Sequence, residues 1–313
     1  MNRKVTLTGA NILFFIFAVV FIGYQLVLGI ILGDRLYDHL YTVVLVNEFV
    51  MILGPVLIYC LVKKINIRET FRFNNPGLVP TLLVVLISVP AYFVAAMLNN
   101  VLIYFLQFIG KLPATPIPVP RNLQELAAGI LVIAVAPGIC EEIMHRGLLL
   151  RAYEKRGSYK AVVIVSVFFG IFHFDITNFF GPVFLGLIIG YYVIRTNSIF
   201  AGMLAHFLNN TIAEVIQYFW GDKTPPDTLT VSWPDLQQLL LIGAGCAVVT
   251  GALLVLFKKV TANRAVIIPP ISTARQDAQA VLSHWPVILV FVLYVLMLLL
   301  YLFTIILMKN FGM

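Results

Sequence analysis

The sequence predicts an all-α, polytopic transmembrane helical bundle. Of the 313 residues, 61% are hydrophobic and only 11% are charged, whereas a soluble globular chain has about 25% charged residues. Several apolar stretches are also long enough to span a bilayer as helices, which takes roughly 18 residues or more. Backbone groups at membrane depth must bond to one another, and the alternating pattern of barrel strands is absent. We therefore expect residues 1–313 to form a single integral membrane domain in the lipid bilayer.

Hydropathy places nine spans along the chain. They are Ile12–Leu32, Val43–Val62, Pro80–Ile109, Leu123–Leu150, Ala161–His173, Phe179–Ile194, Ile199–Trp220, Leu236–Phe257 and Trp285–Met308. The first lacks a small-residue cleavage site and is interpreted as a retained anchor rather than a signal peptide. The longest polar connection, 258–284, separates the ninth span from the others. Residues 258–313 are therefore expected to form a cytoplasmic loop followed by an accessory C-terminal helix.

Basic residues alternate along this list of spans. They precede the first span and follow the second, fourth, sixth and eighth: Arg3, Lys4, Lys63, Lys64, Arg68, Arg72, Arg151, Lys155, Arg156, Lys160, Arg195, Lys258, Lys259, Arg264 and Arg275. The positive-inside rule then places the N-terminus in the cytoplasm and the C-terminus outside. The net charge of +7 is this cytoplasmic excess facing anionic lipid, so no nucleic-acid partner is expected.

Several polar residues inside the spans have structural explanations. Glu48 is expected to pack against other groups or to line a cavity, and Glu214 lies near the outer end of its span, where it can reach water. Asn99 and Asn100 are expected to bond to neighbouring helices. The three cysteines are isolated and form no CxxC pair, so neither a zinc–thiolate site nor a disulfide framework is predicted.

Four other polar residues converge at one depth of the bilayer. Glu141, His173 and His206 each lie ten to thirteen residues from a basic residue at the cytoplasmic end of their spans, roughly 15–20 Å at 1.5 Å per residue. Asn210 follows His206 by one turn on the same helical face. A carboxylate, two imidazoles and an amide are the equipment of a hydrolytic site. The alternative is that each group separately bonds helices together.

The adjacent glutamates in GICEEIMHRG are expected to divide two tasks. Glu142 and Arg146 are spaced i, i+4 with the glutamate first, which favours a local ion pair. Glu141 points about 100° away around the helix and has no such partner, so it is predicted to be the general base and acid. Pro137 and Gly138 are expected to disrupt the helix and to open a water-lined notch.

Three motifs on separate apolar helices carry a resemblance to a known family. They are Glu141-Glu142-x-x-x-Arg146, Phe169-x-x-x-His173 and His206-x-x-x-Asn210. Together they resemble the motifs of the CAAX protease and bacteriocin-processing family, which includes the Ras-converting endopeptidase. The motif-bearing core covers about residues 122–215. The stretch GPVFLGLIIGYY resembles the family's glycine-rich helix, in which Gly186 and Gly190 form a face for close helix packing.

The resemblance implies an intramembrane endopeptidase of the glutamate type. Glu141 and His173 would activate the attacking water, and His206 and Asn210 would donate hydrogen bonds to the oxyanion. Phe169 would pack beneath the cavity. The expected partner is a peptide or protein substrate, the expected location is a prokaryotic cell membrane, and no cofactor or metal is implied. The chain departs from the family in His145, where an aromatic residue is usual, and in a ninth span beyond an eight-helix core.

Three other functions are compatible with some of these features. A zinc peptidase would use Glu141, His173 and His206 as ligands, although no HExxH motif occurs. A non-enzymatic bacteriocin-immunity or regulatory protein would need none of the four polar residues. A transporter would show inverted repeats or paired broken helices, and neither is found in the sequence.

Overall fold

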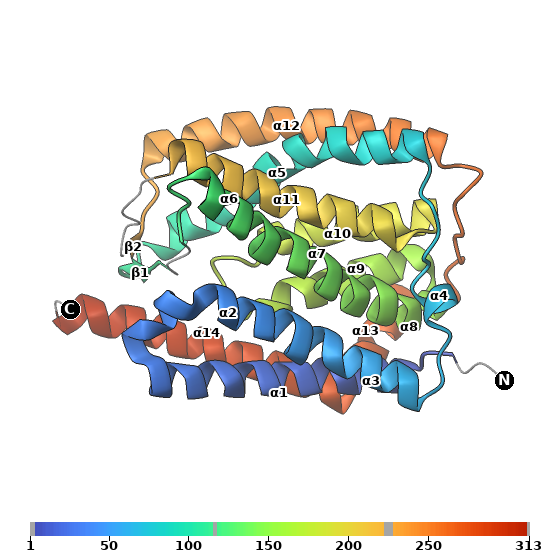
Figure 1. The fold of residues 1–313 in the computed structure, drawn as a ribbon, viewed down its shortest axis with the longest axis horizontal. Helices are drawn as coiled ribbons and strands as arrows, with labels where there is room; N and C mark the ends of the chain where they lie inside the picture. The colour runs from blue at the N-terminus through green and yellow to red at the C-terminus, as the bar shows by residue number, and fades with distance from the viewer. Residues whose placement is uncertain (1–3, 115–117, 222–227, 312–313) are drawn as a thin grey trace.

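Helices form nearly all the regular structure in the part of the chain that the computed structural model describes, residues 4–114, 118–221 and 228–311 (Figure 1). Among these residues, seven helices are long and apolar enough to cross a membrane, and two shorter apolar helices accompany them. Each of the nine predicted spans corresponds to one of these helices. The predicted helical bundle is thus confirmed, while the number of crossings and the cytoplasmic N-terminus stay predictions. Arg3 and residues 115–117 lie outside the described residues.

The elements follow in chain order. The first half contains α1 (Leu7–Leu32), η1 (Gly33–His39), α2 (Leu40–Leu45), η2 (Val46–Leu53), α3 (Gly54–Val62), α4 (Ile67–Thr70), α5 (Leu78–Leu106) and β1 (Leu112–Pro113). The second half contains α6 (Leu123–Gly129), η3 (Ile130–Val135), α7 (Ala136–Glu142), η4 (Ile143–Leu149), α8 (Leu150–Tyr153), η5 (Glu154–Arg156), α9 (Ser158–Phe172), α10 (Phe180–Thr196), α11 (Ile199–Trp220), β2 (Thr228–Leu229), α12 (Trp233–Val260), α13 (Ala274–Leu282) and α14 (Trp285–Phe311).

Local sequence signals begin and end several of these helices. Asn122 accepts a hydrogen bond from the Glu125 amide at the start of α6, which satisfies one of the free N–H groups of the first turn. Thr273 and Gln276 form a reciprocal capping box at the start of α13. At the end of α10, Asn197 adopts the left-handed conformation with φ 51°, which asparagine tolerates better than most residues.

The helices are arranged so that the motif-bearing ones lie inside. α5 packs along α12 on one side of the bundle, and α1 packs along α14 on the other, with α7, α9, α10 and α11 between them (Figure 1). Gly186 and Gly190 of α10 face Ser166 and Val162 of α9 so closely that a Cβ on either glycine would lie about 3.0 Å from them. The predicted small-residue packing face is therefore confirmed.

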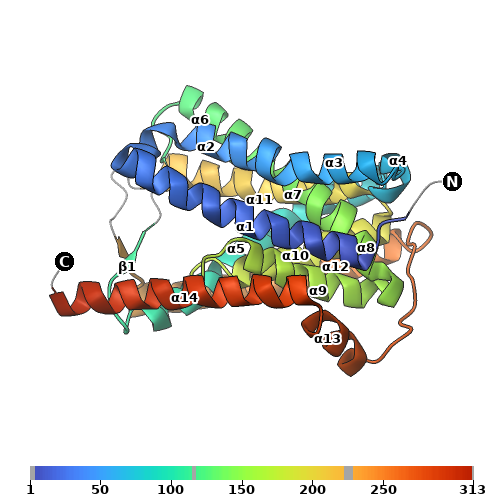
Figure 2. The ribbon, with the colours of Figure 1, turned by 90° about the horizontal axis from the view of Figure 1, so that it is seen from below.

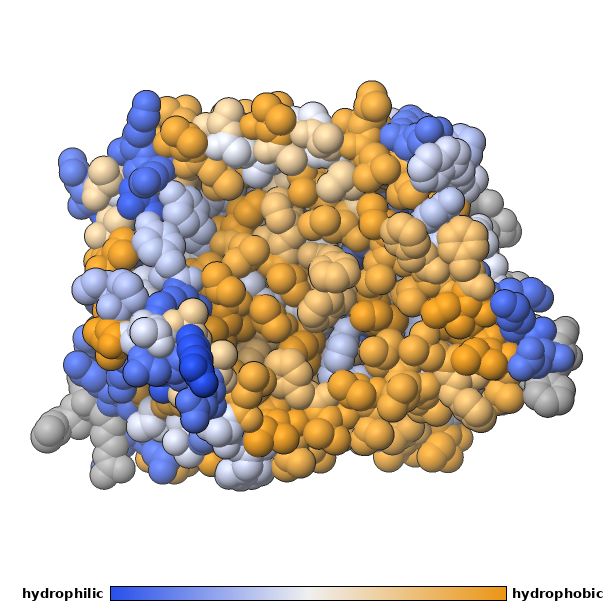
Figure 3. All heavy atoms as spheres, turned by 180° about the vertical axis from the view of Figure 1, so that it is seen from behind, coloured by the Kyte–Doolittle hydropathy of each residue, from blue (hydrophilic) through white to orange (hydrophobic). Residues whose placement is uncertain are grey.

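The two ends of the bundle are polar and the middle is apolar. One face of the molecule shows a hydrophobic band between hydrophilic ends (Figure 3), as a membrane-spanning bundle requires. The two termini lie at opposite ends (Figures 1 and 2). The basic loops meet at one end, where Arg72 and Arg151 pair with Glu154, and Arg156 pairs with Asp277.

The polar connection 261–273 crosses this basic end of the bundle and leads into α13. Its Val266 amide donates to the Ile194 carbonyl, and its Ile268 amide donates to the Ser158 hydroxyl. Asp277 then joins α13 to the start of α9, where it pairs with Lys160. Burial alone would raise the pKa of Asp277, but hydrogen bonds from Lys160, Ser272 and Arg156 lower this pKa to about 2. The aspartate is therefore held as a carboxylate.

The structure contradicts two predictions for polar residues within the spans. Glu214 is only 1% exposed, and one of its carboxylate oxygens has no hydrogen-bond partner in the described chain, so it does not reach water. The Asn100 amide donates to Ala96 of its own helix rather than to a neighbour. Asn99 behaves as predicted, because it bonds to Asn178 and to the Gly181 amide. The positions of residues along a helix do not show which face of that helix packs against a neighbouring helix, so the sequence could not distinguish these cases.

Candidate active site

The helix from Leu123 to Arg156 carries the paired glutamates and changes its winding on both sides of them. The segment α7 lies between two π-helical segments, η3 and η4, and single π turns are frequent at functional sites. The helix continues through Pro137 and Gly138 without a break, and the predicted disruption is limited to the change from π to α winding just before Pro137. The cavity beside Gly138 measures about 320 Å³ and is lined by apolar side chains, so it does not supply the predicted water-lined notch, which stays a prediction. A proline near the start of a helical segment removes only one N–H and need not break the helix.

Glu142 lies at the centre of a buried ion pair. The Arg146 guanidinium donates to Glu142 Oε1 at 2.6 Å, and both side chains are at most 1% exposed. The Arg146 guanidinium also lies 4.5 Å from the centre of the Phe169 ring, which is a favourable place for a cation. The predicted local pair is confirmed, and it holds Arg146 against the Phe169 ring.

Glu142 also fixes the imidazole of His206 on the facing helix α11. The same oxygen, Glu142 Oε1, lies 3.0 Å from His206 Nδ1. A carboxylate only accepts hydrogen bonds, so Nδ1 carries the proton and Nε2 is directed elsewhere. The close approach depends on Gly202, one turn before His206, where a Cβ would lie 2.9 Å from Glu142 Oε2. No motif in the sequence points to this glycine, because its requirement arises only from the contact between two helices.

His173 is held in a similar way by its own helix. It follows the last residue of α9 and is half-buried, and its Nδ1 lies 2.8 Å from the Phe169 carbonyl oxygen. Because a carbonyl only accepts, Nδ1 donates, and Nε2 is left with its lone pair. The Phe169 ring packs edge-on against the imidazoles of both His173 and His206, with centroids 5.1 and 5.6 Å apart. Phe169 therefore packs against both histidines, and its expected place beneath a cavity stays a prediction.

Glu141 faces His206 from the neighbouring position on α7. Its Oε2 lies 3.9 Å from His206 Nε2 and has no hydrogen-bond partner in the described chain, although the residue is only 8% exposed. A buried carboxyl oxygen without a partner is costly, and such groups are concentrated at functional sites. Glu141 thus differs from Glu142 in the way that the sequence predicted, since only Glu142 has an ion pair.

Asn210 makes a contact that the sequence analysis did not foresee. Its side-chain amide donates to the Ile133 carbonyl at 2.9 Å. Pro137, four residues after Ile133, has no N–H to donate to that carbonyl in an α-helix, so Asn210 supplies the bond instead. An amide nitrogen has two hydrogens, so this contact uses one of them. Asn210 consequently has a structural task whether or not it also binds substrate.

His145 and Glu48 lie close to the glutamates. His145 is fully buried, and its Nδ1 donates to the Glu141 carbonyl at 2.9 Å. Its ring packs edge-on against Phe169 and Phe172, so it occupies the space of an aromatic residue and faces neither solvent nor a second ion pair. Glu48 is 3% exposed on η2, which packs on α7, and its carboxyl acts electrostatically on Glu141. The expectation that Glu48 lies in a packed wall is confirmed.

The histidine orientations suit either a base or a metal ligand, because metal-bound imidazoles are commonly fixed by a carbonyl or carboxylate on the other nitrogen. Among the residues described here, however, no group of three His, Cys, Asp or Glu side chains is placed to hold a metal ion. Glu141, His173 and His206 thus lie near one another without forming the ligand set that the zinc alternative requires.

The fold and this cluster of residues define a multi-pass integral membrane protein with a buried polar site. Residues 123–212 match the family model of the type II CAAX prenyl endopeptidase Rce1-like proteins. The chain is also 26% identical over 154 residues to a Bacillus subtilis (strain 168) protein named "Putative membrane peptidase YdiL". That match covers 48% of this chain and 62% of the relative. No solved structure matches the chain significantly. The resemblance to the CAAX protease and bacteriocin-processing family is therefore confirmed.

Proposed function

We propose that the protein is an intramembrane endopeptidase of the glutamate type, which hydrolyses a bond in a peptide or protein substrate. The observation that carries the proposal is the difference between the two adjacent glutamates. Oε2 of both glutamates has no hydrogen-bond partner in the described chain, but Glu142 Oε1 is bound by Arg146 and His206, whereas the nearest partner of the Glu141 carboxyl is His206 Nε2 at 3.9 Å. The family match and the named relative support the same class of activity.

In the proposed reaction, water lies between Glu141 and the unprotonated Nε2 of His173. Glu141 accepts a proton from this water as the oxygen attacks the peptide carbonyl carbon, and a tetrahedral oxyanion forms. Glu141 then returns the proton to the amide nitrogen, and the C–N bond breaks to give a carboxylic acid and an amine. The second proton of the water passes from the acid to the amine, which leaves a carboxylate and an ammonium group. The water supplies one oxygen of the product carboxyl group and both protons, so no further reactant is needed.

Two donors would stabilise the oxyanion in this proposal. One is His206, whose ring is held by the contact between its Nδ1 and Glu142 Oε1, so that an Nε2 proton would be directed at the oxyanion. Asn210 would use the amide hydrogen that is not engaged by Ile133. One such donor contributes about 2.7–4 kcal/mol to catalysis in comparable sites.

The test is hydrolysis of labelled peptides by the purified protein in detergent. We expect the wild type to cleave at least one peptide of a diverse library and Glu141→Gln to cleave none while remaining folded. Glu125→Gln is a matched control, because Glu125 lies on the same continuous helix and bonds only to the exposed Arg121 and Asn122 at its start. Equal hydrolysis by the wild type and by Glu141→Gln would contradict the proposal.

A further inference from the structure

The connection between α9 and α10 lies at membrane depth. These helices have 15 and 17 residues, about 22 and 25 Å at 1.5 Å per residue, whereas the hydrocarbon core is about 30 Å thick. The connection, residues 173–179, accordingly stops short of the end of the bundle where β1 lies (Figures 1 and 2). Non-helical backbone at such depth is tolerated where protein buries it or where it lines a water-filled cavity.

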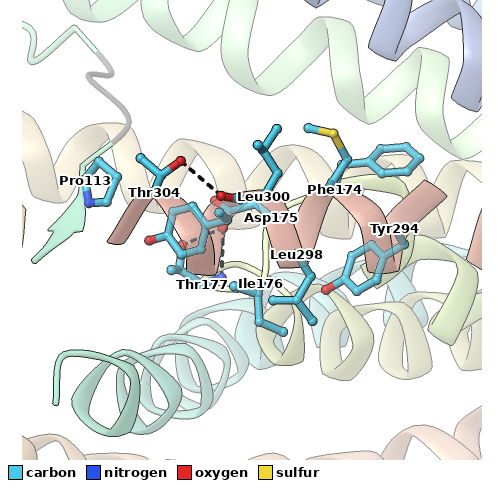
Figure 4. A pocket seen from close by; sticks show the side chains of 11 residues that line it. Pro113, Phe174, Asp175, Ile176, Thr177, Tyr294, Leu298, Leu300 and Thr304 are labelled. Atoms are coloured by element: carbon cyan, nitrogen blue, oxygen red, sulfur yellow. Dashed lines mark hydrogen bonds between the residues drawn. The ribbon is translucent and has the colours of Figure 1, made fainter. Parts of the chain in front are cut away.

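A cavity of about 340 Å³ lies between this connection and α14. The polar side chains of Asp175, Thr177, Tyr294, Tyr301 and Thr304 line it together with apolar residues of α14 (Figure 4). None of its lining residues is basic. This composition contrasts with the cavity beside Gly138, which has a similar volume and only apolar lining residues.

Two tyrosine hydroxyls of this cavity are not satisfied by the described protein, whereas the hydroxyls of Thr177 and Thr304 donate to Asp175 and to the Leu300 carbonyl. Tyr294 is 9% exposed, and its hydroxyl has no hydrogen-bond partner within the described chain; the Tyr301 hydroxyl has none either. The hydrogen bonds to the Asp175 carboxylate come from the amide and hydroxyl of Thr177, and both reach Oδ1. A buried hydroxyl without a partner costs about 1–3 kcal/mol. A water molecule occupies about 30 Å³ in the liquid, so a polar cavity of this size accommodates several.

The cavity is lined by Phe174 and Asp175, the two residues that directly follow the proposed catalytic histidine in the chain. Asp175 follows His173 by two residues, and Phe174 between them has φ 49°, so the chain turns sharply where α9 ends. The imidazole and the cavity-lining carboxylate consequently lie on either side of a single turn. Hydrolysis inside an apolar bundle requires water at Glu141 and His173, and the apolar cavity on the other side of α7 is a poor source of it.

We propose that the cavity between α14 and residues 173–177 is a water-filled chamber that supplies the hydrolytic water to His173. The supply part of this inference rests on the proposed peptidase function, whereas the hydration of the chamber does not. In this proposal, α14 has two functions. This helix covers non-helical backbone at membrane depth and contributes the two tyrosine hydroxyls that hold the water.

The test of hydration is hydroxyl-radical footprinting by X-ray radiolysis of the purified full-length protein, read out by mass spectrometry. Side chains beside bound water are oxidised by radicals formed in place, so Tyr294 and Tyr301 should be oxidised quickly. Tyr192 is the internal control, because its hydroxyl is also buried without a partner but its ring packs against Phe257 in the core. Oxidation of Tyr294 and Tyr301 no faster than that of Tyr192 would show that the cavity is dry or filled by an acyl chain, and would overturn the proposal.

The test of supply uses a side chain that fills the chamber. Leu298→Trp should lower the rate at which His173 is oxidised, toward the rate for Tyr192. It should also lower kcat with little change in KM. Leu296→Trp is the matched control, since Leu296 lies on the same helix but is 55% exposed on the outer surface, and it should leave both readouts unchanged. If Leu298→Trp changes neither His173 oxidation nor kcat, the chamber does not supply the site. If the wild type cleaves no peptide, the proposed function fails, and His173 oxidation still decides whether the chamber reaches the histidine.

Discussion

Replacement of Glu142 by glutamine tests the division of tasks between the two glutamates. Glutamine keeps the shape of the side chain but removes the charge that faces Arg146, whose guanidinium is 2.6 Å away and only 1% exposed. Breaking a buried ion pair from one side costs about 3–5 kcal/mol, because the other charge is left uncompensated. His206 loses its carboxylate partner at the same time. Since whole domains are stable by only about 5–15 kcal/mol, Glu142→Gln should be strongly destabilised.

The measurement is thermal unfolding in detergent, followed with a dye that fluoresces on reaction with thiols. Cys60 and Cys140 are buried, so their reaction reports unfolding. Glu141→Gln is the matched control: the same chemical change is made one residue away, at a carboxyl whose closest charged partner, the His206 ring, is 3.9 Å distant. It should unfold near the wild-type temperature and be inactive, whereas Glu142→Gln should unfold well below it.

A double substitution distinguishes loss of the ion pair from general damage to the core. Glu142→Gln combined with Arg146→Met removes both charges, and replacement of a whole buried pair by uncharged groups is often nearly neutral. The double variant should therefore recover most of the stability lost by Glu142→Gln. If Glu142→Gln unfolds at the same temperature as the wild type but is inactive, while Glu141→Gln remains active, the two assigned tasks are reversed.

Other expectations concern the oxyanion donor, metal dependence, acid stability and topology. Asn210→Ala should lower kcat by about 10²–10³, the usual loss of one oxyanion donor, with little change in KM; a change in thermal stability alone would leave Asn210 a structural role only. Prolonged treatment with a strong chelator should leave turnover unchanged, and inactivation that added zinc reverses would favour the metallopeptidase. The pKa of Asp277 is held at about 2, below the usual value near 3.9, so its stabilising contribution is complete above about pH 4 and is lost as the pH falls through 2. Asp277→Asn should therefore lower thermal stability at pH 7 and remove this acid dependence. Equal unfolding temperatures of the wild type and Asp277→Asn at pH 7 would contradict this prediction. Cysteine introduced at Lys155 should react only with reagents in the cytoplasm, and cysteine at Arg121 only with external ones; reaction of both from one side would contradict the nine-span topology.

Much of the fold and part of the site follow from short-range features of the sequence. Apolar segments determine the spans, because a helix is the structure that satisfies the backbone of each segment without outside partners. The ion pair between Glu142 and Arg146 is equally local, since residues four apart lie on one face of any α-helix. The orientation of His173 is also local, because its imidazole bonds to the carbonyl of Phe169 one turn earlier.

The sequence by itself determined the membrane class, the positions of the helices and the candidate site residues. Only the tertiary structure decided which of these residues contact one another across helices. His206 bonds to Glu142 and Asn210 to Ile133, Gly202 makes room for the glutamate, and Glu214 is buried rather than wetted. Each of these contacts depends on the rotation of one helix against another. That rotation is set by the summed packing of many side chains, and no short stretch of sequence contains it.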